Sequence, residues 1–443
     1  MKRIQLTAIQ TIAAGFAAII LIGALLLMLP VSNRAEPLGF LNALFTSTSA
    51  TCVTGLVVCD TWSQFTLFGQ IVLLLLIQLG GLGFVTVMVL LMFALDRRIG
   101  LRERALLSES ISFTQVGGVL VLVRRVLIGT ALAEGLGAVL LSIRMVPRFG
   151  WATGIWYGVF HSVSAFCNAG FDLMGRLEPY SSFTWFRDDW LVNLVLIALI
   201  LTGGIGFVVW SDLWDNRLHV KKWALHTKLM LFMTGLLTLV PFVLYLLSER
   251  NGAMAGLTVP QRIIAALFQT VTPRTAGMNT IDLASLSPAG TLLTVMLMFI
   301  GAGVGSTGGG VKVTTFSVTV LAIWSYMRGR KDLNVFRRRV EETTVRRAVL
   351  TTVFYFLVAA VSVLGIELVQ GLPLPDVLME VFSALGTVGL STGLTRELNT
   401  VSRIVIMILM YSGRVGSLTV LLSVSERKPR ANLRNPAEKI IVS

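Results

Sequence analysis

Charged side chains are scarce in this chain of 443 residues, where Asp, Glu, Lys and Arg together make up 14%. Apolar residues make up 55%, and the mean hydropathy is +0.80. A water-soluble protein of this length needs far more charge to cover its surface, and a disordered chain holds far fewer apolar residues. The composition therefore excludes an ordinary soluble fold and intrinsic disorder.

Cysteine and histidine are also rare, with three of each. Cys52, Cys59 and Cys167 are too few for a disulfide framework, and three histidines argue against a multi-histidine metal centre. Acidic residues number 23 against 37 basic ones, which gives a net charge of +14. That excess suits either nucleic acid or a membrane surface, and the positions of the charges decide between the two.

Long apolar stretches are what the sequence does contain, and a helix of about 20 such residues crosses a bilayer. Eight spans are expected, near residues 9–30, 65–95, 126–147, 190–214, 226–248, 290–325, 347–370 and 401–424. With the N-terminus inside, 25 of the 37 Lys and Arg residues fall on inner segments and nine on outer ones. Because basic residues gather on the cytoplasmic side, this predicts a multi-pass protein of the cell membrane with both termini cytoplasmic. It also explains the basic charge without nucleic acid.

A short pattern recurs in the semi-polar segments on the expected outer side. Three segments read Ser-Ala, four further residues and a glycine, and a fourth has its glycine in the same register. These glycines are Gly55, Gly170, Gly277 and Gly389, at spacings of 115, 107 and 112 residues. Inside the next apolar stretch a second glycine cluster follows each of them, at residues 80–83, 203–206, 301–303 and 413–416. Two markers in one register, four times over, indicate an internal repeat of helix, re-entrant pore segment and helix.

The glycines admit two interpretations. Inside a membrane helix, glycine allows neighbouring helices to approach closely, and this interpretation is favoured for 80–83 and 203–206. Gly55, Gly170, Gly277 and Gly389 precede the second spans, where irregular backbone is tolerated only if it is buried or lines a watery cavity. Four such loops around an axis would present rings of carbonyl oxygens that replace the water of a potassium ion. Glycine takes the backbone angles that this arrangement requires.

The residues now described resemble those of a known family. The segments that carry the resemblance are 50–56, 166–171, 271–277 and 386–391, together with 299–315 and 412–416. They are similar to the Trk/Ktr/HKT superfamily of potassium transporters, and most closely to its membrane subunit of the KtrB type. The resemblance covers essentially the whole chain.

The resemblance implies an all-α polytopic membrane protein of four pseudo-symmetric M1–P–M2 repeats around a central pore. Eight transmembrane helices and four re-entrant pore helices are expected, in repeats 1–97, 98–217, 218–331 and 332–443, the last with a cytoplasmic tail. K⁺ would bind the filter carbonyls. The implied filter residues are Val53, Thr54, Gly55, Asn168, Ala169, Gly170, Thr275, Ala276, Gly277, Thr387, Val388 and Gly389.

The glycine-rich stretch 301–310 breaks the second helix of the third repeat, since so much glycine disfavours a helix. Its Gly-x-Gly-x-x-Gly match is a weak dinucleotide signal, because no strand–helix alternation surrounds it. The resemblance implies an intramembrane gate below the filter, and the alternative is a flexible kink. The gate residues are Gly301, Gly303, Gly305, Ser306, Thr307, Gly308, Gly309, Gly310, Lys312 and Arg414.

Other ionisable residues lie at or near membrane depth, where charges are costly and suggest function. Arg414 either obstructs the pore or bonds freed carbonyls, and Lys312 alternatively reaches the inner surface. Arg274 is expected to anchor its pore segment through carbonyl bonds. Glu134 and Glu367 are expected to form structural pairs.

The sequence therefore predicts the potassium-conducting subunit of an uptake system, not an enzyme. The resemblance implies a homodimer in the lipid bilayer, no covalent cofactor, possible coupling to Na⁺, and regulation by a separate cytosolic ring of the KtrA type. ATP or ADP would bind that ring only. Two alternatives stay open: a membrane-embedded enzyme, although no catalytic constellation is present, and an alternating-access carrier.

Overall fold

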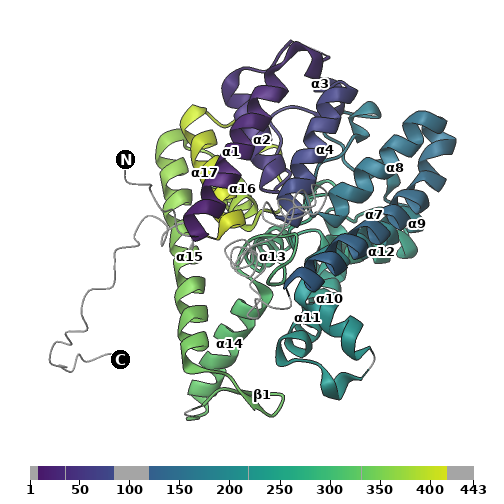
Figure 1. The fold of residues 1–443 in the computed structure, drawn as a ribbon. Coiled ribbons are helices and arrows are strands. Elements are labelled where there is room, and N and C mark those ends of the chain that lie inside the picture. The colour runs from purple at the N-terminus through teal and green to yellow at the C-terminus, as the bar shows by residue number, and fades with distance from the viewer. Residues whose placement is uncertain (1–7, 35, 84–118, 218, 331, 417–443) are drawn as a thin grey trace, which may run out of the picture.

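The computed structural model describes residues 8–34, 36–83, 119–217, 219–330 and 332–416, and it is almost entirely helical (Figure 1). The one sheet in this part of the chain is a hairpin of β1 (Asn334–Val335) and β2 (Arg338–Arg339). The same order of a long helix, a short buried helix and a second apolar helix occurs four times. The sequence expectation of a repeated helical unit therefore agrees with the order of the elements.

The long helices are α1 (Ala8–Met28), α7 (Val119–Phe149), α11 (Leu225–Ser248) and α15 (Glu342–Gln370). They supply the four single helices of the described chain that are long and apolar enough to cross a membrane. A helix is suited to this place because it satisfies its backbone hydrogen bonds internally. Each of the four covers all or nearly all of an apolar stretch that the sequence predicts as a span.

The short buried helices are α2 (Phe40–Thr51), α8 (Trp151–Phe166), α12 (Val259–Val271) and α16 (Leu374–Gly386). Each is 12 to 16 residues long and, like each of the second apolar helices, is too short by itself to cross about 30 Å of hydrocarbon at 1.5 Å per residue. Each leads into a loop that holds one of the four repeated glycines, Gly55, Gly170, Gly277 and Gly389. The C-terminal halves of these helices are almost fully buried, and the loops that follow them therefore lie inside the protein.

The second apolar helices are α4 (Leu67–Leu82), α9 (Trp190–Gly204), α13 (Pro288–Phe299) and α17 (Thr400–Val415). Each starts at a side-chain cap that accepts a bond from the first turn: Thr66, Asp189, Ser287 and Asn399. Such caps satisfy backbone donors that a helix start leaves free. The polar caps therefore fix where each helix begins.

All four second helices end at or just before their glycine clusters, and for two of the expected spans this is a correction. Gly83, Gly206 and Gly416 have φ values of 84°, 97° and 99°, which a helix does not accommodate. The span expected over 190–214 is wrong in its inner part, because α10 (Phe207–Asn216) departs from α9 at 92°. The span expected over 290–325 is two helices, α13 and α14 (Val313–Met327), separated by a loop. Residues 84–95 and 417–424 of the other two lie outside the described residues.

Contacts between the units close into a cycle. Each second helix packs on the short helix of the following unit: α4 on α8, α9 on α12, α13 on α16, and α17 back on α2. The first and last units thus meet although about 350 residues separate α2 from α17. This closure puts the four short helices and their loops at the centre. Among the described residues, the one further α-helix is α3 (Thr61–Gln64).

Candidate ion pathway

Gly55, Gly170, Gly277 and Gly389 form a closed ring. A Cβ on Gly170 would lie 3.1 Å from the Cα of Gly277 and 3.2 Å from that of Gly55. A Cβ on Gly277 would lie 3.1 Å from the Cα of Gly389, and one on Gly389 would lie 3.0 Å from that of Gly55. Glycine is the residue that permits four backbones to approach this closely around one axis.

The backbone has the same shape in all four loops. The glycine φ values are 95°, 72°, 77° and 96° in chain order. Two residues before each glycine, φ is again positive, at Val53 (56°), Asn168 (58°), Thr275 (73°) and Thr387 (50°). Positive φ in a residue other than glycine costs about 1–3 kcal/mol and persists only where the surroundings impose it. The alternation is the kind that aims successive carbonyls the same way, as an ion-binding filter requires.

Hydrogen bonds from the short helices hold these loops in place. The amides of Thr54, Ala169 and Val388 donate to carbonyls five residues earlier, at 2.7 to 2.8 Å. The amides of Gly55 and Gly389 donate to the hydroxyls of Ser49 and Ser383, at 3.1 and 2.9 Å. The serine of the repeated Ser-Ala pattern thus supports the glycine six residues later in two of the units.

The second glycine cluster serves close packing, as favoured for 80–83 and 203–206. A Cβ on Gly80 would overlap the carbonyl of Thr51, and one on Gly203 would overlap that of Phe166. Gly413 has the same relation to Leu385. Each of these carbonyls lies four residues before the ring glycine of its unit, so the missing side chains let the second helices touch the bases of the loops.

Residues 300–312 form a loop between α13 and α14 that lies against one side of the glycine ring. The Gly309 amide donates to the Thr387 hydroxyl at 3.0 Å, and a Cβ on Gly308 would overlap the hydroxyl of Thr275. Both threonines belong to the predicted filter. Other bonds join the loop to the end of α9 and the start of α10: Gly303 N donates to Gly204 O, and Phe207 N donates to Gly305 O, both at 2.8 Å. The loop is therefore held against the ring and against its neighbouring helices by specific hydrogen bonds.

Arg414 and Lys312 both bond this region. The Arg414 guanidinium donates to the Thr307 carbonyl in the loop and to the carbonyls of Gly80 and Gly81, the latter two at 2.5 and 3.0 Å. It therefore joins the loop to the end of α4. The Lys312 ammonium donates to the Gly308 carbonyl at 2.7 Å. The alternative that Lys312 reaches the inner surface is thus wrong, because this carbonyl turns its ammonium back to the loop.

Three further predictions for buried charges have separate outcomes. Arg274 contacts the hydroxyls of Thr234 and Thr238 on α11 at 3.5 Å, which corrects the expected carbonyl bonds. Glu134 is paired as expected, accepting from Gln78 at 3.2 Å. The pair expected for Glu367 does not form at its Oε1 atom, which is buried without a hydrogen-bond partner among the described residues.

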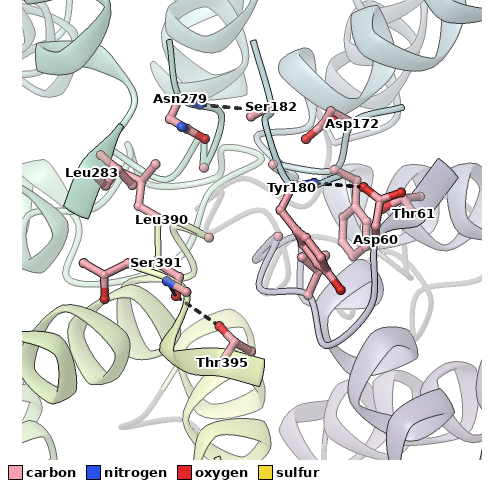
Figure 2. Close-up of a pocket in the computed structure, with 18 of the residues that line it drawn as sticks. Asp60, Thr61, Asp172, Tyr180, Ser182, Asn279, Leu283, Leu390, Ser391 and Thr395 are labelled. Atoms are coloured by element: carbon pink, nitrogen blue, oxygen red, sulfur yellow. Dashed lines mark hydrogen bonds between the residues drawn. The ribbon is translucent and has the colours of Figure 1, made fainter. Parts of the chain in front are cut away.

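A cavity of about 210 Å³ opens on the side of the ring that the loop 300–312 does not cover (Figure 2). Its lining includes all four ring glycines and the carboxylates of Asp60, Asp172 and Asp282. The Asp60 carboxylate accepts from the Tyr180 amide at 3.2 Å. Removal from water raises the pKa of Asp172 to about 7, and Asp60 acts in the same direction. Acidic groups at this mouth attract cations.

Sequence reasoning missed these carboxylates. Asp60 and Asp282 each follow a ring glycine by five residues, and Asp172 follows Gly170 by two. This repeated register was a usable signal. The missing information was that the four outer segments converge, as Figure 2 shows for residues from four parts of the chain.

Comparison with known proteins places this geometry in a family. Residues 6–435 match the family model TrkH, described as a cation transport protein. The chain is 41% identical to the Ktr system potassium uptake protein B of Bacillus subtilis (strain 168), covering 98% of this chain and 97% of that protein. It is 40% identical to the potassium/sodium uptake protein NtpJ of Enterococcus hirae, covering 99% and 98%.

Among solved structures, the fold is similar to that of the potassium transporter TrkH from Vibrio parahaemolyticus. The TM-score is 0.74 at 21% identity, over 95% of this chain and 86% of that one. At this identity the likeness concerns the fold alone. With a family match over nearly the whole length and relatives near 40% identity, the chain belongs to the TrkH family of cation transport proteins.

Proposed function

We propose that this chain is the membrane subunit of a potassium uptake system and conducts K⁺ through the ring of four glycines. The observation that carries the proposal is the closed ring, with positive φ at each glycine and again two residues earlier. Such backbone can offer carbonyl oxygens in place of the ion's water. The printed names of the relatives, which are potassium and potassium/sodium uptake proteins, support the choice of ion.

The filter assignment covers the four three-residue segments 53–55, 168–170, 275–277 and 387–389. Their backbone conformations agree, and a cavity with three carboxylates meets them from outside. K⁺ is the cargo in this proposal, held by backbone carbonyls. Na⁺ accompanies or activates transport, which is consistent with the name of the Enterococcus relative.

The proposed topology has eight membrane crossings and four re-entrant pore helices, α2, α8, α12 and α16. Repeats 1–97, 98–217, 218–331 and 332–443 surround the pore. Both termini are cytoplasmic and the membrane is the cell membrane. The support is the fourfold order of the elements, their cyclic contacts and the excess of basic residues on the inner segments. The pore helices then begin on the outer side.

The proposed gate is the loop 300–312 together with Arg414. It lies against Thr275 and Thr387 on the inner side of the ring, so an ion leaving the filter inward meets it first. Arg414 adds a fixed positive charge and joins the loop to α4. A gate requires a second arrangement in which these bonds are released and the loop moves away from the ring.

The proposed assembly is a homodimer with a cytosolic nucleotide-binding ring of the KtrA type, which carries the ATP or ADP. The word "system" in the names of the Ktr relatives supports a multi-component assembly. The membrane-enzyme alternative is excluded because the chain belongs to a family of cation transport proteins. An alternating-access carrier is disfavoured because all four units run in the same direction, which suits a central pore better than inverted repeats.

The deciding experiment is uptake of labelled rubidium or potassium into potassium-depleted cells that lack their own uptake systems. Cells with this chain and its ring partner should take up the label in a saturable way, and sodium in tenfold excess should not abolish uptake. Cells with a well-expressed Gly389→Ser variant should show strongly reduced uptake. Uptake no faster than in cells with an empty vector would refute the proposal.

A further inference from the structure

A pocket of about 440 Å³ lies between the start of α11 and the tip of the β1–β2 hairpin, away from the filter. In Figure 1 the hairpin lies at the lower edge of the molecule, opposite α3. The ring, the loop 300–312 and the outer cavity do not use any of its residues. The pocket is therefore available for another ligand.

One part of its lining is apolar and partly exposed. Phe232 on α11 and Phe336 at the hairpin tip meet edge to face, with ring centroids 6.1 Å apart. Their exposed fractions are 58% and 48%, although both are large aromatic residues. Trp223 is held in place because its indole donates to the Arg217 carbonyl at 2.9 Å. These rings form a surface suited to an acyl chain.

The other part of the lining is cationic. Lys221, Lys228 and Arg337 face the pocket, and no carboxylate is among the described residues that line it. The Lys228 ammonium donates to the Lys221 carbonyl at 3.3 Å, which keeps the two lysines together. Acids on adjoining segments have other partners, since Asp332 pairs with Arg339 at 3.0 Å. The pocket thus presents uncompensated positive charge.

The hairpin tip holds its two pocket residues in an unfavourable backbone conformation. Phe336 has φ 49° and Arg337 has φ 63°, in a two-residue turn that normally favours Asn and Gly. Positive φ is uncommon for a bulky residue such as Phe. Strain of this kind gathers at sites that bind ligands. The strained backbone is therefore an independent indication that these two side chains take part in binding a ligand.

The pocket continues an apolar surface along α11. Beyond Phe232, the exposed residues Leu236, Leu239, Val240 and Val243 follow on the outward side of the same helix. Large apolar residues exposed along a membrane helix face lipid. A ligand with an acyl chain can therefore reach the pocket from the bilayer, whereas a soluble partner meets its charged rim alone.

We propose that this pocket binds one anionic phospholipid of the inner leaflet. The phosphate is held by Lys221, Lys228 and Arg337, and one acyl chain lies against Phe232 and Phe336. Juxtamembrane Lys and Arg bind anionic lipid surfaces by the same attraction. The assignment to the inner leaflet rests on the proposed topology. The binding itself does not.

Native mass spectrometry of the purified, detergent-solubilised protein tests the proposal. The probes are phosphatidylglycerol, phosphatidylcholine with the same acyl chains, and inorganic phosphate alone. The test variant is Lys221→Gln/Lys228→Gln/Arg337→Gln. The matched control is Lys222→Gln/Arg330→Gln/Arg338→Gln, which removes the same charge from neighbouring positions that do not line the pocket.

Wild type and control should retain phosphatidylglycerol about equally, and the test variant should bind it roughly a hundredfold more weakly, as a loss of about fivefold for each of three cations implies. Phosphatidylcholine and inorganic phosphate should bind weakly to all three. Phe336→Gly, which accepts positive φ without strain, should keep the fold and also weaken lipid binding. Size-exclusion profiles check that each variant is folded.

Equal retention by the test variant and the control would overturn the proposal. So would a test variant that keeps its lipid but no longer retains its cytosolic partner, because the pocket would then be a protein contact. Neither readout uses ion flux, so a failure here is distinct from a failure of rubidium uptake. A topology that places the hairpin outside would change the leaflet and leave the lipid site intact.

Discussion

The four ring glycines are crowded to different degrees, and this allows their substitutions to be ranked. A Cβ would lie no closer than 3.1 Å to its nearest neighbour at Gly170 and would come within 2.6 Å at Gly55. At Gly277 and Gly389 it would overlap the carbonyls of Val388 and Thr54 more severely still. The damage from a serine should therefore rise from Gly170 through Gly55 to Gly277 and Gly389.

Strain of about 1–3 kcal/mol corresponds to roughly 5- to 150-fold in an equilibrium constant. We expect Gly389→Ser to lower rubidium affinity or its preference over sodium by at least about tenfold, and Gly170→Ser to do so least. Competition of sodium with labelled rubidium measures both. Gly39→Ser is the control, since a Cβ there meets nothing within 4 Å. Four equal effects, or none, would remove the filter assignment.

Arg414 combines a charge with a set of hydrogen bonds. At an effective dielectric constant near 20, a cation roughly 4 Å away is repelled by about 4 kcal/mol, which pore water reduces. We expect Arg414→Ala and Arg414→Gln to raise maximal rubidium flux, because a barrier lower by about 1.4 kcal/mol gives roughly a tenfold rate. Arg403→Gln, on the same helix but bonded to Asn42, is the control.

Arg414→Lys separates the two contributions. It keeps the charge but cannot join the Thr307 and Gly80 carbonyls with one ammonium as the planar fork does. Flux that stays low in the lysine variant assigns the barrier to charge. Flux as high as in alanine assigns it to the bonds that hold the loop. Normal or reduced flux in a well-expressed alanine variant would leave Arg414 a structural anchor only.

At the scale of elements, the long helices α7 and α15 each carry one partly buried glutamate, and the two form a natural comparison. Glu134 on α7 accepts from Gln78 on α4, and Cys167 at the end of α8 lies 3.5 Å from the same Gln78. Glu367 on α15 has its Oε1 buried without a partner among the described residues. Glu134 thus links three helices next to the filter, whereas Glu367 has a carboxylate oxygen that is removed from water without gaining a hydrogen bond.

We therefore expect Glu134→Leu to lower stability by about 1–3 kcal/mol, because it leaves the Gln78 amide unsatisfied. Glu367→Leu should be neutral or stabilising, since it removes a buried carboxylate oxygen that has no hydrogen-bond partner among the described residues. Thermal unfolding of the purified variants measures both. Adding Gln78→Leu to Glu134→Leu should recover part of the loss. Equal destabilisation by the two single leucine variants would contradict the assigned pairing.

The loop 300–312 is an element that can be shortened. Deleting residues 305–308 removes the part that Arg414 and Lys312 bond and leaves the Gly303 contact with α9. We expect higher rubidium flux and weaker dependence on the cytosolic partner, because the obstruction inside the filter is smaller. Flux is compared at matched membrane expression. A deletion variant with wild-type flux that still needs its partner would indicate a kink without a gating role.

For the whole molecule, the proposed topology predicts which surfaces meet which side of the membrane. A cysteine at Trp185, which is 52% exposed in the outer segment, should react with an impermeant thiol reagent in intact cells. A cysteine at Arg338 in the hairpin should react only after the membrane is opened. Cys52 and Cys167 are buried and give little background, and Cys59 is replaced by serine. The opposite pattern would invert the topology and the leaflet of the lipid site.

Sequence alone determined the class of the protein, the order of its repeats and the positions of the ring glycines. Apolar length and basic asymmetry are properties of local composition, and the need for a residue without a Cβ shows in the sequence as glycine in a fixed register. These features require no knowledge of which segments meet. The fourfold order of the elements and the φ values at Gly55, Gly170, Gly277 and Gly389 agree with them.

Only the tertiary structure decided which distant segments of the chain contact one another. The closure of α17 onto α2, the bonds of Arg414 to Gly80 and Gly81, and the convergence of Asp60 with Asp172 join residues far apart in the chain. The ends of all four second helices also belong here, because a glycine cluster in an apolar stretch suits either a close helix contact or a break. In this fold both occur, because Gly80, Gly203 and Gly413 pack against carbonyls of the short helices at the points where their own helices end, and those carbonyls come from another segment of the chain.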